Sequence, residues 1–262
     1  MSSLGHHVRI RLESDRMLHT SAAHRRTIAR SVYRISEPWP LLAFGCAGVH
    51  LHLVVLADHA DAGELARRLE IGLQRSLGFG VPFLKVHRKE LADQQHLRQA
   101  VLYDIGQRKH HDLASDPYLE ATSAPDLLGA RMIGGFLLSR IREHVPELRH
   151  RDVLAAFGLP GLSGPEVETN PDRIREAVLS AAAIPSLQGA TPEAQAARVA
   201  TVALAGPTIS SADLAKSLET SRRSIQRLRS ARPSSALLRA ASIQLALRQQ
   251  ADKLAEGATP LP

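Results

Sequence analysis

The strongest chemical signal in the sequence is a pair of histidines in the apolar segment 49–55, which reads VHLHLVV. The segment is typical of a strand, and side chains alternate between the two faces of a strand. His50 and His52 would therefore project side by side from one face. Two adjacent imidazoles fill an apolar core poorly, but they offer neutral nitrogen ligands to a divalent metal. An isolated His-x-His is more often a solvated sheet face, so the motif needs support from elsewhere in the chain.

A predicted helix at residues 93–109 supplies a second set of reactive groups. Tyr103 and Gln107 are four residues apart and would lie on the same helix face. The amide oxygen of Gln107 suits a hard divalent cation, and a tyrosine oxygen can attack a phosphodiester whose charge a metal neutralises. Arg108 and Lys109 would contact phosphates and favour ionisation of the phenol, whose ordinary pKa is about 10. On this helix alone, a core tyrosine and a surface glutamine are the simpler interpretation.

The segment 211–229 has the pattern of a helix-turn-helix. Leu214 and Leu218 would anchor a first helix, and Ser221 would cap a second helix held by Ile225 and Leu228. Residues 216–239 contain seven Lys/Arg and one acidic residue, which suits a nucleic acid, although a surface hairpin rich in arginine is the alternative. The side chains left to meet phosphates or base edges are Arg222, Arg223, Gln226, Arg227 and Arg229.

The order of the elements predicts an α+β fold with a mostly antiparallel sheet, followed by an all-α region. We expect strands at residues 7–12, 41–46, 49–57 and 81–87, and helices at 20–33, 61–77 and 93–109. After Asp126 the sequence has helical periodicity only. The predicted division is a first domain at 1–120, a helical connecting region at 121–206, the helix-turn-helix region at 207–250 and a flexible tail at 251–262.

Composition narrows the class of protein. The chain has 262 residues and a formal net charge of +7, which favours a polyanionic partner. Its single cysteine, Cys46, lies in an apolar run and is expected to be buried packing; an internal disulfide would need a second cysteine. The sequence has neither a secretory leader pattern nor a membrane-length apolar run, so we expect a cytoplasmic protein without a membrane partner.

Taken together, residues 5–120 resemble the HUH single-strand transposase superfamily, and within it the REP-associated tyrosine transposases. The resemblance rests on His50-Leu51-His52, on Tyr103 followed by Gln107, and on the order and separation of the two motifs. It implies a ferredoxin-like core with Mg²⁺ or Mn²⁺ held by His50, His52 and Gln107. It also implies that Tyr103 cleaves and rejoins single-stranded or hairpin DNA through a covalent 5′-phosphotyrosine link.

The sequence leaves two other functions open. A non-catalytic DNA-binding regulator would keep the first domain as a scaffold and use residues 221–229 for recognition. A metal-dependent RNA-binding or RNA-processing protein is a third hypothesis. The predicted sheet argues against it, because it lacks the exposed aromatic residues that normally stack bases. The sequence does not decide whether the protein forms a homodimer.

Overall fold

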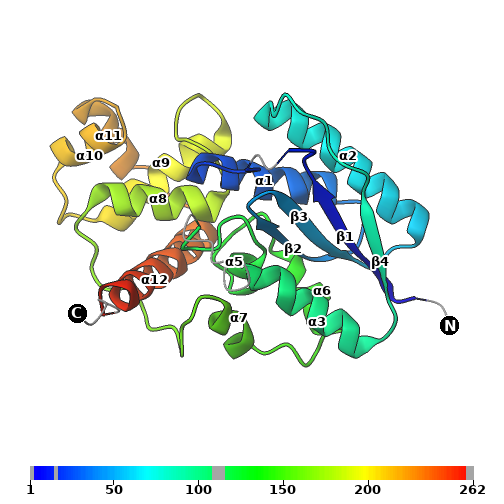
Figure 1. Cartoon of the computed structure of the whole chain (residues 1–262). Coiled ribbons are helices and arrows are strands. Elements are labelled where there is room, and N and C mark those ends of the chain that lie inside the picture. Colours follow the sequence, from blue (N-terminus) through cyan, green and yellow to red (C-terminus); the bar gives the residue numbers. More distant parts are fainter. Residues whose placement is uncertain (1–2, 15–16, 108–115, 258–262) are drawn as a thin grey trace, which may run out of the picture.

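The computed structural model describes residues 3–14, 17–107 and 116–257, and its N-terminal part is built on a four-stranded sheet. The strand order is β2-β3-β1-β4, and every neighbouring pair is antiparallel (Figure 1). The predicted α+β class is therefore confirmed. The strands are β1 (Gly5–Arg11), β2 (Leu41–Ala47), β3 (His50–Val55) and β4 (His87–Leu91).

Helices cover the two faces of this sheet unequally. Helices α1 (Ala22–Ile35) and α2 (His59–Leu77) lie on one face (Figure 1). Strand alternation turns Val8, Ile10 and Leu53, all fully buried, away from the face that carries His7 and His52. Helix α3 (Gln94–Ile105) lies on the other face, against β2 and β3. The β1–β4 half of that second face therefore lies outside the main footprint of α3.

The close packing of α3 on the sheet depends on Gly45. A Cβ atom at this position would overlap the backbone carbonyl of Asp104, so only glycine lets α3 approach β2 this closely. The helix begins with the Asp93 side chain accepting a hydrogen bond from the backbone of His96, and it ends at the C-cap Gly106. Helix α3 covers residues 94–105 of the predicted helix at 93–109, whose last two residues lie outside the described part of the chain.

The fourth strand lies later in the sequence than predicted. The expected strand at 81–87 was wrong, because the apolar residues of that segment pack beside the end of β1 as a loop; Leu12 and Phe83 form one isolated bridge there. Pro82 has no backbone N–H to give to a sheet ladder. The actual β4 has the sequence HRKEL and is mostly exposed, as suits a polar edge strand.

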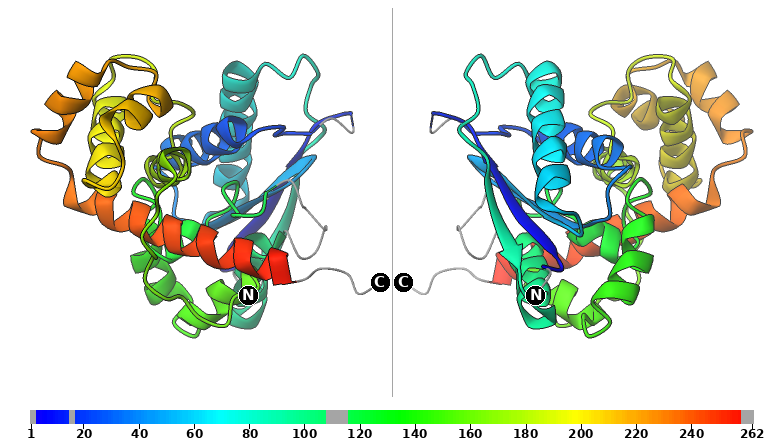
Figure 2. Two further views of the ribbon diagram at one scale, coloured as in Figure 1. Left: turned by 90° about the vertical axis from the view of Figure 1, so that its left-hand side faces the viewer. Right: turned by 90° about the vertical axis from the view of Figure 1, so that its right-hand side faces the viewer.

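The remainder of the described chain is helical, as the sequence predicted. The long helix α12 packs its Leu237 and Ala241 into the C-terminal core and its Leu247 into the N-terminal core. Figure 2 shows it running from the side of α10 and α11 across to the side of the sheet. It continues to Gly257, beyond residue 251 where the predicted tail begins. The helices are α5 (Ala124–Leu127), α6 (Phe136–His144), α7 (His150–Ala156), α8 (Pro171–Ala182), α9 (Pro192–Ala205), α10 (Ser211–Ser217), α11 (Arg222–Arg229) and α12 (Ser235–Gly257).

A buried ion cluster joins α12 to the N-terminal part. Glu120, which is 1% exposed, accepts hydrogen bonds from Arg25 and Arg26 of α1 and from Arg248 of α12. Burial alone would raise the pKa of Glu120, but the arginines outweigh it and hold that pKa at about 2. The carboxylate is therefore charged. It shares the balancing of the arginines with Asp116, which pairs with Arg25, and with Glu176, which pairs with Arg26.

In the described ranges, no helix combines the length and the apolar character needed to cross a membrane.

Candidate functional site

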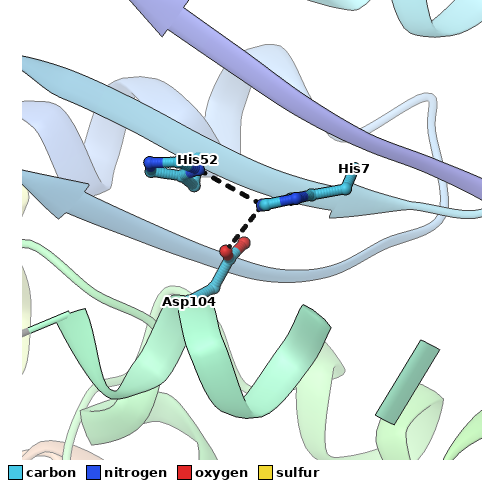
Figure 3. Close-up of side chains that lie close together, drawn as sticks. All are labelled: His7, His52 and Asp104. Carbon is cyan, nitrogen blue, oxygen red and sulfur yellow. Dashed lines mark hydrogen bonds and ion pairs between the residues drawn. The ribbon is translucent and has the colours of Figure 1, made fainter. Parts of the chain in front are cut away.

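Three side chains converge on the face of the sheet that α3 covers. His7 Nε2 lies 3.0 Å from Asp104 Oδ1, and His52 Nδ1 lies 3.2 Å from the same His7 nitrogen (Figure 3). One ligand atom from each residue lies within 4.8 Å of the other two. His52 and Asp104 are buried and His7 is partly exposed, so the cluster opens to solvent on the β1 side.

Strand register and the position of α3 bring these three residues together. In the β1–β3 ladder His7 pairs with Val54 and Arg9 pairs with His52, which places His7 and His52 diagonally on one face. Gly45 pairs with His52 on the other side, and the close approach of α3 over Gly45 carries Asp104 to the two imidazoles. The cluster therefore combines two adjacent strands and a helix from distant parts of the sequence.

The separations within the cluster fit a bound divalent ion. Ligand atoms about 2.1 Å from an ion at tetrahedral or octahedral angles lie about 3.0–3.4 Å apart. The two hydrogen-bonded pairs already have this spacing. In addition, Asp104 Oδ2 is buried and accepts no hydrogen bond from the residues that the structure describes. Two imidazoles and one carboxylate suit a first-row transition ion such as Mn²⁺ or Zn²⁺ better than Mg²⁺, which prefers oxygen ligands and water.

The electrostatics of Asp104 also favour a cation. Burial raises the pKa of Asp104 above its ordinary value, while the hydrogen bond and charge of His7 oppose this effect. A buried carboxylate is costly without a positive partner. A divalent ion between Asp104, His7 and His52 would supply that partner.

Tyr103 stands beside the cluster. Its ring centroid lies 5.4 Å from that of His52 and 5.9 Å from that of His7, edge-on to both imidazoles. It precedes Asp104 on α3, so one helix delivers both the phenol and a carboxylate ligand. Tyr103 is half-buried, which leaves part of the side chain accessible from solvent.

Of the other predicted ligands, His50 lies beside His52 but outside the three-atom cluster, and Gln107 lies near Gly45, the cross-strand partner of His52. The His50 ring lies 4.6 Å from the His52 ring, and the shared face that strand alternation predicted is confirmed. Gln107 is buried against Gly45, and its Nε2 donates to the Tyr103 carbonyl. Its Oε1 has no hydrogen-bond partner among the described residues, so Gln107 stays a predicted ligand. Arg108 and Lys109 lie outside the described residues.

Sequence reasoning missed two of the three converging residues. His7 is 43 positions before His50, and only the antiparallel pairing of the first and third strands shows that it faces His52. The available signal was the alternation of residues 7–12, which puts His7 and Arg9 on the polar face of a predicted strand. Asp104 directly follows Tyr103, and a helical wheel places it away from the Tyr103–Gln107 face that the sequence argument followed.

The predicted helix-turn-helix segment consists of two short helices, α10 and α11, which contact each other. Between them Glu219 adopts a left-handed conformation with φ of 49°, and the Ser221 side chain caps α11 by accepting from Ser224 N. Ile225 and Leu228 are buried, as predicted. Arg229 donates to the Ile209 carbonyl at 2.9 Å. The five residues predicted to face a nucleic acid are all exposed: Arg222, Arg223, Gln226, Arg227 and Arg229.

Comparisons of the chain with protein-family models, with curated protein sequences and with solved structures find no match. The chemistry of the site therefore rests on the geometry of its own residues.

Proposed function

We propose that the protein cleaves and rejoins single-stranded DNA through a covalent phosphotyrosine at Tyr103, with a divalent metal held by His7, His52 and Asp104. The observation that carries the proposal is the tyrosine ring beside a His-His-Asp cluster, open to solvent at His7, whose ligand atoms have metal-binding separations. The β-α-β-β-α-β order and the strand order β2-β3-β1-β4 agree with the ferredoxin-like core that the family resemblance implies.

The proposed reaction is an in-line displacement at phosphorus. The Tyr103 oxygen, having lost its proton to solvent or a nearby base, bonds to the phosphorus. The bond from phosphorus to the 3′ oxygen breaks, and that oxygen takes up a proton to become a free 3′ hydroxyl. The 5′ phosphate stays on Tyr103, so attack by a 3′ hydroxyl reverses the step and rejoins the strand. When bound, the metal would neutralise phosphate charge and polarise the phosphorus.

The residues of the chain have separate tasks in this scheme. His7, His52 and Asp104 would hold the ion, and the α3 backbone would hold Tyr103 beside it. Gly45 fixes the height of α3 above the sheet, so it sets the separation of nucleophile and ligands. Reactive groups held by packed secondary structure lose little further entropy in the reaction.

A non-catalytic DNA-binding regulator is the second candidate function. The observation that favours it is the exposed basic face of α11, whose apolar residues Ile225 and Leu228 are buried and whose Arg222, Arg223 and Gln226 are exposed. Such a face suits the major groove or the backbone of a duplex. α11 would also serve the catalytic proposal, by binding the duplex stem of a hairpin.

Denaturing electrophoresis tests the proposed chemistry directly. The protein is incubated with labelled single-stranded hairpin DNA and Mn²⁺, and a metal-dependent protein–DNA adduct is expected. Tyr103→Phe should abolish the adduct, because it removes only the attacking oxygen. Tyr118→Phe is a matched control, since Tyr118 is another partly buried tyrosine but donates to Asp252 at 2.8 Å. An adduct that survives in Tyr103→Phe refutes the assignment, and DNA binding without an adduct favours the regulator.

A further inference from the structure

The face of the sheet that carries the candidate site continues over β1 and β4, outside the part that α3 covers, and there it carries a row of basic side chains. Strand alternation puts Arg9 of β1 on the same face as His7, and the β1–β4 ladder pairs His7 with Lys89 and Arg9 with His87. Arg9, His87 and Lys89 are all exposed. We call Arg9, His87 and Lys89 the basic strip.

The strip adjoins the candidate metal centre directly. Lys89 is the cross-strand neighbour of His7, and Arg9 is the cross-strand neighbour of His52. The acidic residue of β4, Glu90, alternates to the opposite face with Arg88. A phosphate bound at the His7–His52–Asp104 cluster would therefore have positive side chains beside it on the sheet. The next phosphates of the same nucleic-acid strand would lie against those side chains.

We infer that the basic strip binds the sugar-phosphate backbone of a single nucleic-acid strand and leads it to the cluster, without reading its bases. This inference deepens the proposed function and rests on it for the meaning of the cluster, but it can be tested by binding alone.

The dimensions of the strip suit one strand. Paired β-strands lie about 4.8 Å apart, so the two β-strands β1 and β4 make a strip about the width of the phosphate backbone of one nucleic-acid strand. Same-face residues along a strand are about 6.8 Å apart, a spacing comparable to that of successive phosphates in an extended single strand. α3 borders the strip on the β3 side, so the more deeply covered part of the face is closed to a second strand.

The composition of the strip predicts recognition that does not depend on base sequence. The strands GHHVRIR and HRKEL contain no Phe, Tyr or Trp, the large aromatic side chains on which bases stack most often. Charged side chains that contact only phosphates position a strand but carry no sequence information. The strip should therefore contribute equally to binding of any single strand, whether DNA or RNA.

The test measures binding by fluorescence anisotropy in the Tyr103→Phe background, which keeps the chemistry silent. The probes are labelled oligo-dT, a mixed-sequence single-stranded DNA and the RNA of that mixed sequence. The variant is Arg9→Ala with Lys89→Ala. Its matched control is Arg34→Ala with Arg75→Ala, which removes the same charge from exposed positions on α1 and α2, on the opposite side of the sheet. Thermal melting verifies that both variants are folded.

We expect the strip variant to bind each probe about 25-fold more weakly at low salt, which is about fivefold for each lost charge. The slope of log K against log[salt] should become shallower by about 1.4, because each phosphate contact of a single strand contributes about 0.7. The control should bind within about twofold of the parent.

Three results would refute the proposed role of the basic strip: an equal loss of affinity in the control, an unchanged salt slope, or losses of affinity that differ more than about threefold between probes. The last result would mean that the strip reads the bases, or the sugar where DNA and RNA of one sequence differ. If no adduct forms with wild type but the strip variant shows the expected losses, the catalytic proposal fails and the strip stands. If the adduct forms and the strip variant binds like the parent, the strip alone is wrong.

Discussion

Replacing Asp104 with Asn separates a metal ligand from a purely structural side chain. Asn has nearly the same shape as Asp and can still accept a hydrogen bond from His7, but it lacks the charge that holds a divalent ion. The carboxylate is fully buried, and burial is the main influence that raises its pKa. Losing the charge therefore relieves a desolvation cost while weakening one hydrogen bond, and these two effects oppose each other.

The expected size of the effect follows from linkage. An ion present at 100 times its dissociation constant stabilises the folded protein by about 2.7 kcal/mol. For a chain of 262 residues, about 1 kcal/mol moves the melting temperature by about 2 °C, so wild type should melt about 5 °C higher with metal. In Asp104→Asn the metal-induced shift should nearly vanish, whereas the metal-free melting temperature should stay within about 2 °C of wild type.

The assay is calorimetry or dye-monitored melting in EDTA and then in Mn²⁺ or Co²⁺, with the visible absorption of Co²⁺ as a second readout of binding. Glu90→Gln is a matched control, because it removes an exposed carboxylate from β4 on the opposite face of the sheet. An undiminished metal shift in Asp104→Asn would refute the ligand assignment. A loss of more than about 3 kcal/mol in EDTA would show that Asp104 serves the fold rather than an ion.

Three further predictions concern the framework of the site. Gly45→Ala should cost about 1–3 kcal/mol in urea unfolding and abolish the DNA adduct, because the new methyl group overlaps the α3 backbone; unchanged stability would contradict the close approach. Glu120→Gln should cost about 3 kcal/mol or more, because it removes the buried charge that Arg25 and Arg26 share with other carboxylates and that Arg248 pairs with. An effect below about 1 kcal/mol in unfolding followed by Trp39 fluorescence would count against the cluster. Burial and Arg25 lower the pKa of His19 from 6.5 to about 4. Between these two pH values the unfolded chain binds a proton at His19 that the folded protein does not bind. The free energy of unfolding should therefore decrease as pH falls from 6.5 to 4, by up to about 3 kcal/mol. Stability measured in urea at several pH values should fall less steeply over this range in His19→Leu, and an equal slope in both proteins would exclude His19 as the source.

The sequence predicted the local features of the fold that depend on periodicity and caps. The Ser221 cap of α11 and the shared face of His50 and His52 both follow from short-range rules, and both are confirmed. The fourth strand was misplaced because apolar residues are the usual signal of a strand. β4 instead faces solvent and carries HRKEL, while the apolar segment before it packs as a loop.

The cluster itself was only half predictable. His52 belongs to a recognisable motif, but His7 joins it through strand pairing, and Asp104 joins it through the depth at which α3 packs. Strand pairing and helix packing depth are both features of the tertiary structure, and no spacing of residues in the sequence indicates them. Besides the alternation of residues 7–12, Gly45 was a local trace of them, because a glycine inside a predicted strand marks a place where another backbone approaches closely. Its meaning depends on knowing which element lies above it.

The predicted division into an N-terminal domain and C-terminal helices is likewise bridged by tertiary contacts. Sequence character changes after residue 120, yet α12 contributes to both hydrophobic cores and its Arg248 binds Glu120. Apolar residues of similar volume would hold such a junction at least as firmly as buried ions, so stability alone does not account for the cluster. Hydrogen bonds to one carboxylate restrict the rotation and register of α12 in a way that apolar packing does not. Because α12 is a continuous helix, fixing it beside Glu120 also fixes the core that supports α11, so the exposed basic face of α11 and the Tyr103 site keep one relative orientation.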